Sequence, residues 1–217
     1  MSDTDSFIDE VSEEVRRDRL FRAMKKYGWI AILLVILLVG GAAFNEFRKS
    51  KARTEAQRFG DEILLALQAD EPTTRLAALD DVATTGEKNA LLGFVAAGEE
   101  VDAGQTDSAI KRLKLISSDA SLSSVYRQLA DLKLVLLQGE DLSTDERMAR
   151  LEPLAIAGMP FRLLAEEQMA LAEIASEDFE AALFRLQGIL ADGELTAGLR
   201  RRVSQLIVAL GGELEQA

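Results

Sequence analysis

Apolar residues fall into two patterns along this chain, and the first is a single uninterrupted run. From Tyr27 to Asn45 the chain has nineteen residues without a charge. As a helix, this run spans about 28 Å, close to the thickness of the hydrocarbon core of a bilayer. Basic residues flank both ends, and aromatic residues stand where lipid headgroups would lie. The pattern predicts a transmembrane helix over residues 27–47, in preference to a buried core helix or a cleaved signal peptide. Its predicted membrane anchors are Tyr27, Trp29, Leu33, Leu37, Phe44 and Phe47.

The segment before this run, residues 1–26, changes along its length from acidic to basic. Phe7, Val11 and Val15 recur every four residues, which favours an amphipathic helix against the membrane, and a disordered start is an equal alternative. Six basic residues precede the apolar run and five follow it closely. Because positive residues favour the cytoplasmic side, this count predicts a cytoplasmic tail by a margin of one charge.

A helical stripe continues past the apolar run. Its apolar positions are Ala56, Phe59, Ile63 and Leu67. Because Pro72 cannot continue a helix, the sequence predicts that this helix ends at Asp70.

The second pattern is a repeat in the rest of the chain. Four short segments are apolar at their first, fourth and seventh positions, and they begin at Leu76, Ile110, Met148 and Leu183. Their central leucines lie 34, 38 and 35 residues apart, and an arginine precedes the last three of them. A period near 35 residues is typical of a helical solenoid. The predicted repeat core consists of Leu79, Leu113, Leu151 and Leu186.

Longer apolar stripes lie between the short segments, so each unit is predicted to be a helical hairpin. The stripes are Leu92, Val95 and Val101, then Leu122, Val125, Leu129, Leu132 and Leu136, then Phe161, Leu164, Gln168, Leu171 and Ala175. Turns rich in Gly, Asp and Ser, at residues 104–108, 139–145 and 176–178, separate the first and second helices. A last helix over residues 195–210 is expected to cap the stack.

Two of these turns resemble the tetratricopeptide pattern, in which an Ala opens the second helix. Gly104-Gln-Thr with Ala109 and Glu177-Asp-Phe with Ala182 follow it, and Ala97 and Ala170 stand where the first helix needs a small residue. The third unit departs from the pattern, with Arg147 at the Ala position and Pro153 within its short helix. The expected fold is all-α: a single N-terminal transmembrane helix, then a tetratricopeptide-like solenoid over residues 48–217 with about four hairpins and a C-terminal capping helix.

Composition restricts the chemistry that the chain can carry. Its 217 residues include no Cys and no His, which excludes thiolate catalysis, imidazole bases and the usual zinc ligands. The adjacent Asp80 and Asp81 diverge by about 100° on a helix, and no Gly-rich phosphate loop follows a strand pattern. We therefore expect no enzyme activity, no catalytic, cofactor-binding or metal-binding residue, and no small-molecule substrate. The net charge of −12 argues against a nucleic-acid partner, so Arg200, Arg201 and Arg202 are expected to form a solvated helix face.

The first 50 residues carry a further resemblance. The chain resembles the ancillary SecYEG translocon subunit family (YfgM-like) in the order of its parts and in three motifs: Asp9-Glu10-Val11-Ser12-Glu13-Glu14, Arg16-Arg17-Asp18-Arg19 and Tyr27-Gly28-Trp29. The resemblance implies a single-pass protein of the bacterial inner membrane, with a cytoplasmic N-terminus and a periplasmic C-terminal domain. It implies three protein partners: the SecYEG translocon, a membrane-tethered periplasmic chaperone of the prolyl isomerase type, and exported chains. A periplasmic scaffold for cell-envelope assembly or cell division stays open as an alternative, because both functions need a tethered solenoid.

Overall fold

The computed structural model describes residues 3–213, apart from the side chains of residues 3–20, 22, 23, 28, 31, 32 and 140. Over this range all regular secondary structure is helical, so the predicted all-α class is confirmed. The chain divides into two compact units, Met1–Asp61 and Glu62–Ala217. Residues 48–61, which the sequence assigned to the repeat domain, belong to the first unit.

One long helix, α1 (Asp3–Ala66), makes up the described part of the first unit and continues into the second. Among the residues that the structure describes, no helix has a stretch long and apolar enough to cross a membrane. The predicted membrane segment includes Gly28, Ala31 and Ile32, whose side chains lie outside the description, as do those of the tail stripe Phe7, Val11 and Val15. The transmembrane helix and the amphipathic tail therefore stay predictions from sequence.

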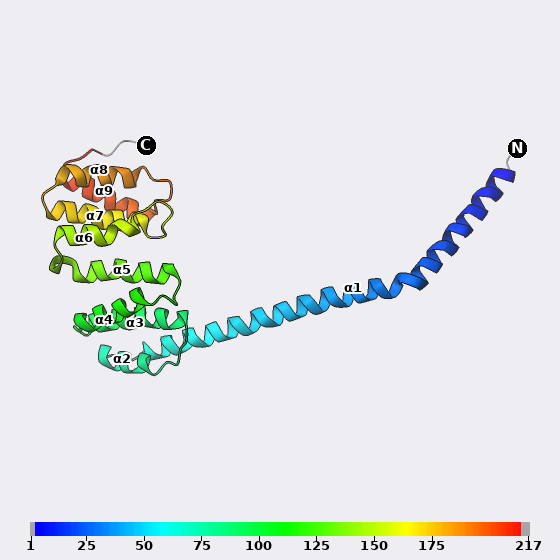
Figure 1. The fold of residues 1–217 in the computed structure, drawn as a ribbon, viewed down its shortest axis with the longest axis horizontal. Coiled ribbons are helices and arrows are strands. Elements are labelled where there is room, and N and C mark those ends of the chain that lie inside the picture. The colour runs from blue at the N-terminus through cyan, green and yellow to red at the C-terminus, as the bar shows by residue number, and fades with distance from the viewer. Residues whose placement is uncertain (1–2, 214–217) are drawn as a thin grey trace. The chain divides into compact units, whose positions relative to one another are not determined.

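The second unit is a stack of short antiparallel helices that follows the end of α1 (Figure 1). Its α-helices are α2 (Pro72–Asp80), α3 (Glu87–Asp102), α4 (Thr106–Ser118), α5 (Ser124–Gln138), α6 (Thr144–Leu151), α7 (Arg162–Ala175), α8 (Phe179–Leu190) and α9 (Ala197–Ala209). Two 3-10 turns, η1 (Gly139–Asp141) and η2 (Glu152–Leu154), lie on either side of α6. The four segments with the repeated leucine pattern form α2, α4, α6 and α8, which are the second helices of successive hairpins.

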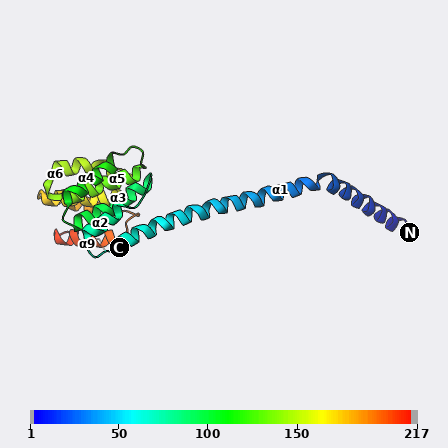
Figure 2. The same cartoon turned by 90° about the horizontal axis from the view of Figure 1, so that it is seen from below.

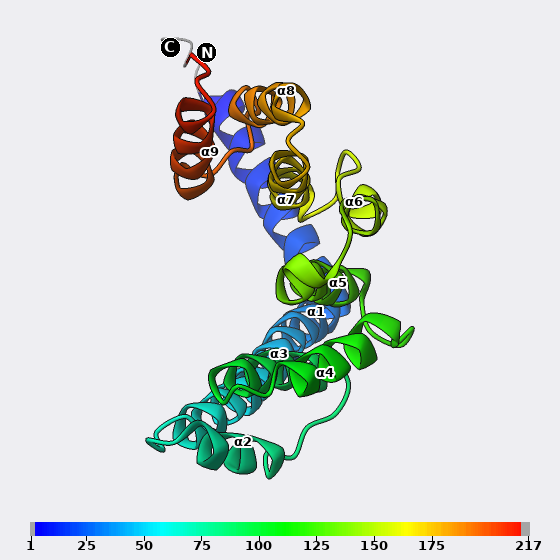
Figure 3. The ribbon, with the colours of Figure 1, turned by 90° about the vertical axis from the view of Figure 1, so that its left-hand side faces the viewer.

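The core of this unit is divided into four clusters, each shared by consecutive helices. The first joins the end of α1 to α2 and α3, the second joins α3, α4 and α5, the third joins α5, α6 and α7, and the fourth joins α7, α8 and α9. Figures 2 and 3 show the same stack from two further sides. Each of these clusters thus lies between helices that follow one another in the chain, which is the arrangement of a solenoid.

Helix boundaries in the stack follow from local side-chain chemistry. Pro72 is the first residue of α2, where its missing N–H is not needed by the helix. A capping box starts α6, because the Ser143 side chain accepts from the Glu146 N–H while the Glu146 carboxylate accepts from the Ser143 N–H. Asp178 and Thr196 cap α8 and α9 through their side-chain oxygens.

Two details differ from the sequence-based expectation. Helix α1 ends at Ala66 rather than Asp70, because its last turn tightens with a bond from the Gln68 N–H to the Leu65 carbonyl. Helix α6 ends at Leu151 and gives way to η2, since Pro153 lacks the N–H that would continue it. Arg147, which stands where the second and fourth hairpins have Ala109 and Ala182, donates from Nε to the Gly139 carbonyl at 2.9 Å and so ties α6 to the preceding turn.

Candidate functional site

The ten residues predicted as membrane anchors or repeat core lie in two contrasting environments. Along α1 the side chains of Tyr27, Trp29, Leu33, Leu37, Phe44 and Phe47 are all exposed. In the repeat unit Leu79, Leu113, Leu151 and Leu186 are each 0% exposed. The structure keeps these two groups on separate units of the chain.

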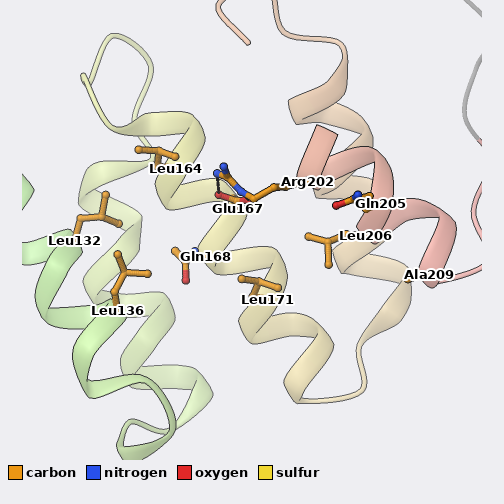
Figure 4. Close-up of a pocket in the computed structure, with 10 residues that line it drawn as sticks. All are labelled: Leu132, Leu136, Leu164, Glu167, Gln168, Leu171, Arg202, Gln205, Leu206 and Ala209. Atoms are coloured by element: carbon orange, nitrogen blue, oxygen red, sulfur yellow. Dashed lines mark hydrogen bonds and ion pairs between the residues drawn. The ribbon is translucent and has the colours of Figure 1, made fainter. Parts of the chain in front are cut away.

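An open pocket of about 680 Å³ lies between α5, α7 and α9. Figure 4 shows the side chains that surround it, with those of α5 facing those of α7 and α9. Its lining residues are Leu132, Leu136, Leu164, Glu167, Gln168, Leu171, Arg202, Gln205, Leu206 and Ala209. Six of the ten are aliphatic, so the walls are largely apolar.

The pocket exists because α5 and α7 have more apolar positions than their packing uses. Helix α5 buries Leu134 in the cluster with α3 and α4, and Val135 in the cluster with α6 and α7. Helix α7 buries Ala165 and Met169 in that same cluster with α5 and α6. The stripe that the sequence suggested for these helices lies beside the buried faces, and much of it opens onto the pocket.

Part of the apolar stripe predicted for the longer helices is exposed and does not pack in the core. Leu136 and Leu164 are exposed, as is Val125 at the other end of α5, although their spacing indicated a core face. The buried residues of these helices include alanines and three glutamates, which a search for large apolar residues passes over. A small residue there lets neighbouring helices approach, and this accounts for the full burial of Ala97 and Ala170.

The third wall, α9, is held in place by its own buried face. Leu199, Val203 and Ile207 recur every four residues and pack in the cluster with α7 and α8. The loop before α9 is fixed by Asp192, whose Oδ2 accepts from Nη2 of Arg162 at 2.6 Å. This hydrogen bond, with a further one from the Glu194 N–H, lowers the pKa of Asp192 below its ordinary value.

An ion pair between Glu167 of α7 and Arg202 of α9 contributes the charged groups of the pocket lining. Nε of Arg202 donates to Oε1 at 2.7 Å, and Nη2 donates to Oε2 at 2.7 Å, so both carboxylate oxygens are occupied. The Glu167 side chain is 6% exposed and that of Arg202 is 51% exposed. The bond to Glu167 raises the pKa of Arg202, and the arginine stays charged.

This ion pair corrects part of the expectation for the arginine run. Arg200 and Arg201 are exposed, as a solvated helix face requires, but Arg202 has a specific structural partner thirty-five residues earlier. Neither Glu167 nor Gln205 was singled out from sequence. Glu167 follows Leu164 by three residues and precedes Leu171 by four, so it lies on the apolar stripe of α7. This position was the available signal, because a carboxylate there must find a cation when it is buried.

The arrangement favours contact with another apolar surface over chemistry on a substrate. Within the described residues no group of three or more acidic side chains is placed to hold a metal ion. Both oxygens of the Glu167 carboxylate accept from Arg202, so this carboxylate is not free to act as a base. An open, leucine-lined pocket with a single ion pair in its lining is typical of a protein-binding surface.

Comparison with known proteins identifies one related family. The model of the tetratricopeptide repeat-like domain family matches residues 24–168, which is more than half of the chain and includes the predicted membrane segment. Neither curated proteins nor solved structures gave a match.

Proposed function

We propose, from the premise that this chain belongs to the tetratricopeptide repeat-like domain family, that it is a non-enzymatic protein-binding module. The observation that carries the proposal is the pocket between α5, α7 and α9, where leucines of three helices face one another and Leu136 and Leu164 are exposed. Repeat domains of this family bind proteins, and an apolar hollow on the face of the stack supplies a surface for doing so.

We further propose that the module is tethered to a membrane by residues 27–47. The support lies in the uncharged run and in the eight large apolar side chains of α1 that the structure describes as exposed over part of it: Ile30, Leu33, Leu34, Val35, Ile36, Leu37, Leu38 and Val39. So much contiguous exposed apolar surface calls for a nonaqueous environment or a partner. A tether also raises the effective concentration of the module toward membrane-bound partners.

The specific role that we propose is that of an accessory subunit of the SecYEG translocon, which links it to periplasmic chaperones during protein export. The support is the resemblance in the first 50 residues, and the topology that it implies is a cytoplasmic tail with a periplasmic domain. The partners would be the translocon, a membrane-tethered chaperone of the prolyl isomerase type, and exported chains.

Site-specific photocrosslinking in the full chain tests this role. A crosslinking residue at Leu37 should recover translocon subunits, and one at Leu136 should recover a periplasmic chaperone or exported chains. Phe184, which is exposed on α8 and does not belong to the pocket lining, provides the matched control position. Recovery of cell-wall synthesis or division proteins at both positions, without the translocon, would replace this role by that of an envelope scaffold.

Protease accessibility tests the proposed topology separately. Protease added to spheroplasts should digest the repeat unit while the cell membrane is intact. If the unit is digested only after lysis, the orientation is reversed, and the proposed role at the periplasmic face fails with it.

A further inference from the structure

We infer that the pocket between α5, α7 and α9 binds the apolar face of an amphipathic helix from a partner protein, and that this helix carries an acidic residue which pairs with Arg202. The inference rests on the proposed protein-binding function and specifies the chemistry of the partner. Three properties of the pocket carry it: its walls, its hydrogen-bonding groups and its charge.

The leucines that line the pocket favour an apolar binding partner. Leu136 and Leu164 project from α5 and α7 and are exposed, while Leu171 and Leu206 are partly buried along the same pocket. Covering these side chains removes aliphatic surface from water, which is the main favourable contribution to such binding. A helix with aliphatic side chains along one face can contact the leucines of α5, α7 and α9 at the same time.

The hydrogen-bonding groups favour a helix over an extended peptide. An extended segment brings a row of unpaired backbone N–H and C=O groups, and each loses free energy if it is desolvated without a partner. Apart from the Glu167–Arg202 ion pair, the pocket lining offers Gln168 and Gln205 as polar side chains. A helix satisfies its own backbone, so it can enter this apolar surface without such partners.

The charge around the pocket favours an acidic guest. Both oxygens of Glu167 are occupied by Arg202, and no other acidic residue belongs to the lining. Among the described residues Nη1 of Arg202 makes no hydrogen bond, and half of this side chain is exposed. Arg201, which is exposed, precedes Gln205 by four residues and therefore lies on the same face of α9.

The Glu167–Arg202 pair has no net charge, so counting the exposed Arg201 beside it leaves one positive charge at this side of the pocket, in a chain that is otherwise acidic. Residues 27–217 contain 19 basic and 30 acidic side chains. The net negative charge of the chain would attract a basic helix, whereas Arg201 and Arg202 beside the pocket would repel it. A carboxylate beside the apolar guest residues can accept from Nη1 of Arg202 while the bond to Glu167 is kept.

Two synthetic peptides test the inference on the full chain in nanodiscs of zwitterionic lipid. Both peptides have about 18 residues, enough for helix formation, with identical leucines on one face. The polar positions flanking that face carry Glu in one peptide and Lys in the other. Fluorescence anisotropy measures each dissociation constant, and empty nanodiscs give the contribution of binding to lipid. The Glu peptide should bind the protein at least about five-fold more tightly than the Lys peptide.

Variants of pocket residues then locate the contact. Leu136→Ser and Leu164→Ser should each weaken binding of the Glu peptide by about ten-fold, because they remove aliphatic surface from the walls. Gln205→Glu should weaken it by about two- to five-fold and Gln205→Lys should strengthen it by a similar factor, since this side chain is exposed beside Arg202. Phe184→Ser is the matched control, because Phe184 is 82% exposed on α8 and does not belong to the lining, and it should leave binding unchanged.

The outcomes separate this inference from the function on which it rests. Equal binding of both peptides, or tighter binding of the Lys peptide, overturns the acidic preference. Unchanged binding in the Leu136 and Leu164 variants, or no binding of either peptide, overturns the assignment of the guest to this pocket. The proposed protein-binding function fails only if crosslinking from the repeat unit recovers no partner, which is a separate measurement.

Discussion

Glu173 and Arg185 lie twelve residues apart and join the two helices of the hairpin α7–α8 by an ion pair. Nε of Arg185 donates to both carboxylate oxygens at 3.0 Å, and Nη2 donates to Oε1 at 2.5 Å. The carbonyl of Glu173 also accepts from the Asp178 N–H at 2.9 Å, which closes the turn between the helices. One residue therefore fixes both the turn and the packing of the helix that follows it.

A bond between the equivalent positions recurs in the second and third hairpins, as an ion pair in the second and as a bond to a neutral amide in the third. Glu100 and Arg112 form the pair in α3–α4, where Nε and Nη2 donate to Oε1 at 3.0 and 2.7 Å. Gln138 replaces the glutamate in the third hairpin and accepts from Nη1 of Arg150 at 2.5 Å. The first hairpin has Ala66 and Ala78 at these positions, and both are part of its apolar cluster. The charged bond raises the pKa of Arg112 and of Arg185 in the two ionic hairpins.

We predict that Arg185→Ala destabilises the repeat unit by about 3 to 5 kcal/mol, because it leaves the buried carboxylate of Glu173 without a cation. Arg150→Ala is the matched control and should cost less than about 1 kcal/mol, since its partner is a neutral amide at an exposed position. Denaturant titration of the full chain measures both. The double variant Glu173→Ala with Arg185→Ala should cost less than the two single changes together, as the first hairpin already carries two alanines. A strictly additive result would mean that the pair does not couple the helices.

A second prediction concerns the repeat core. Leu113→Ala should lower the free energy of unfolding by about 2 to 5 kcal/mol, because Leu113 is fully buried and the change leaves a cavity. Leu115→Ala, two residues along the same helix, should cost less than about 0.5 kcal/mol, since Leu115 is 72% exposed. Comparable losses in the two variants would show that the helix is rotated relative to the structure.

The repeat could be predicted from the sequence because large apolar side chains define it. Leu79, Leu113, Leu151 and Leu186 share a seven-residue apolar pattern and a nearly constant interval, and the structure places all four in the core. The arginine before three of these leucines was also visible in the sequence. Its partner was not, because the partner lies on the preceding helix among alanines, and only the turn geometry brings the two together.

The pocket could not be predicted for a related reason. Two stripes run along α7: one has the large apolar residues together with Glu167, and the other has small residues together with Met169 and Glu173. The strength of the hydrophobic effect favours burial of the larger stripe, yet close packing of helices selects the smaller one. Leu164 and Leu171 are consequently left at the pocket, and a sequence pattern alone does not say which stripe faces the core.

The turns of the second and fourth hairpins supply a third prediction. Gly104 and Glu177 occupy equivalent positions, with φ of 73° and 62°, and each N–H bonds the carbonyl three residues earlier. Residues that have a Cβ are strained in this conformation, whereas glycine is not. Glu177→Gly should therefore stabilise the protein by about 0.5 to 1 kcal/mol. Gly104→Ala should destabilise it by about 1 kcal/mol for the same reason. The shifts in thermal midpoint should therefore have opposite signs, and two shifts of one sign would contradict the equivalence of the turns.

The final prediction concerns the pH dependence of the α6 start. The hydroxyl of Ser143 and then its backbone N–H donate to the Glu146 carboxylate, and these bonds lower the pKa of Glu146. A lowered pKa in the folded state means that ionised Glu146 stabilises α6 above its ordinary pKa of about 4.3, and that this contribution is lost as the pH falls through the lowered value. Glu146→Gln should therefore lower the thermal midpoint at pH 6 to 7, and the difference from the parent chain should shrink below about pH 4. In a Ser143→Ala background the same substitution should have a smaller effect, because one of the two donors is already missing. A difference that grows as the pH falls would show that the carboxylate is not stabilised by these bonds.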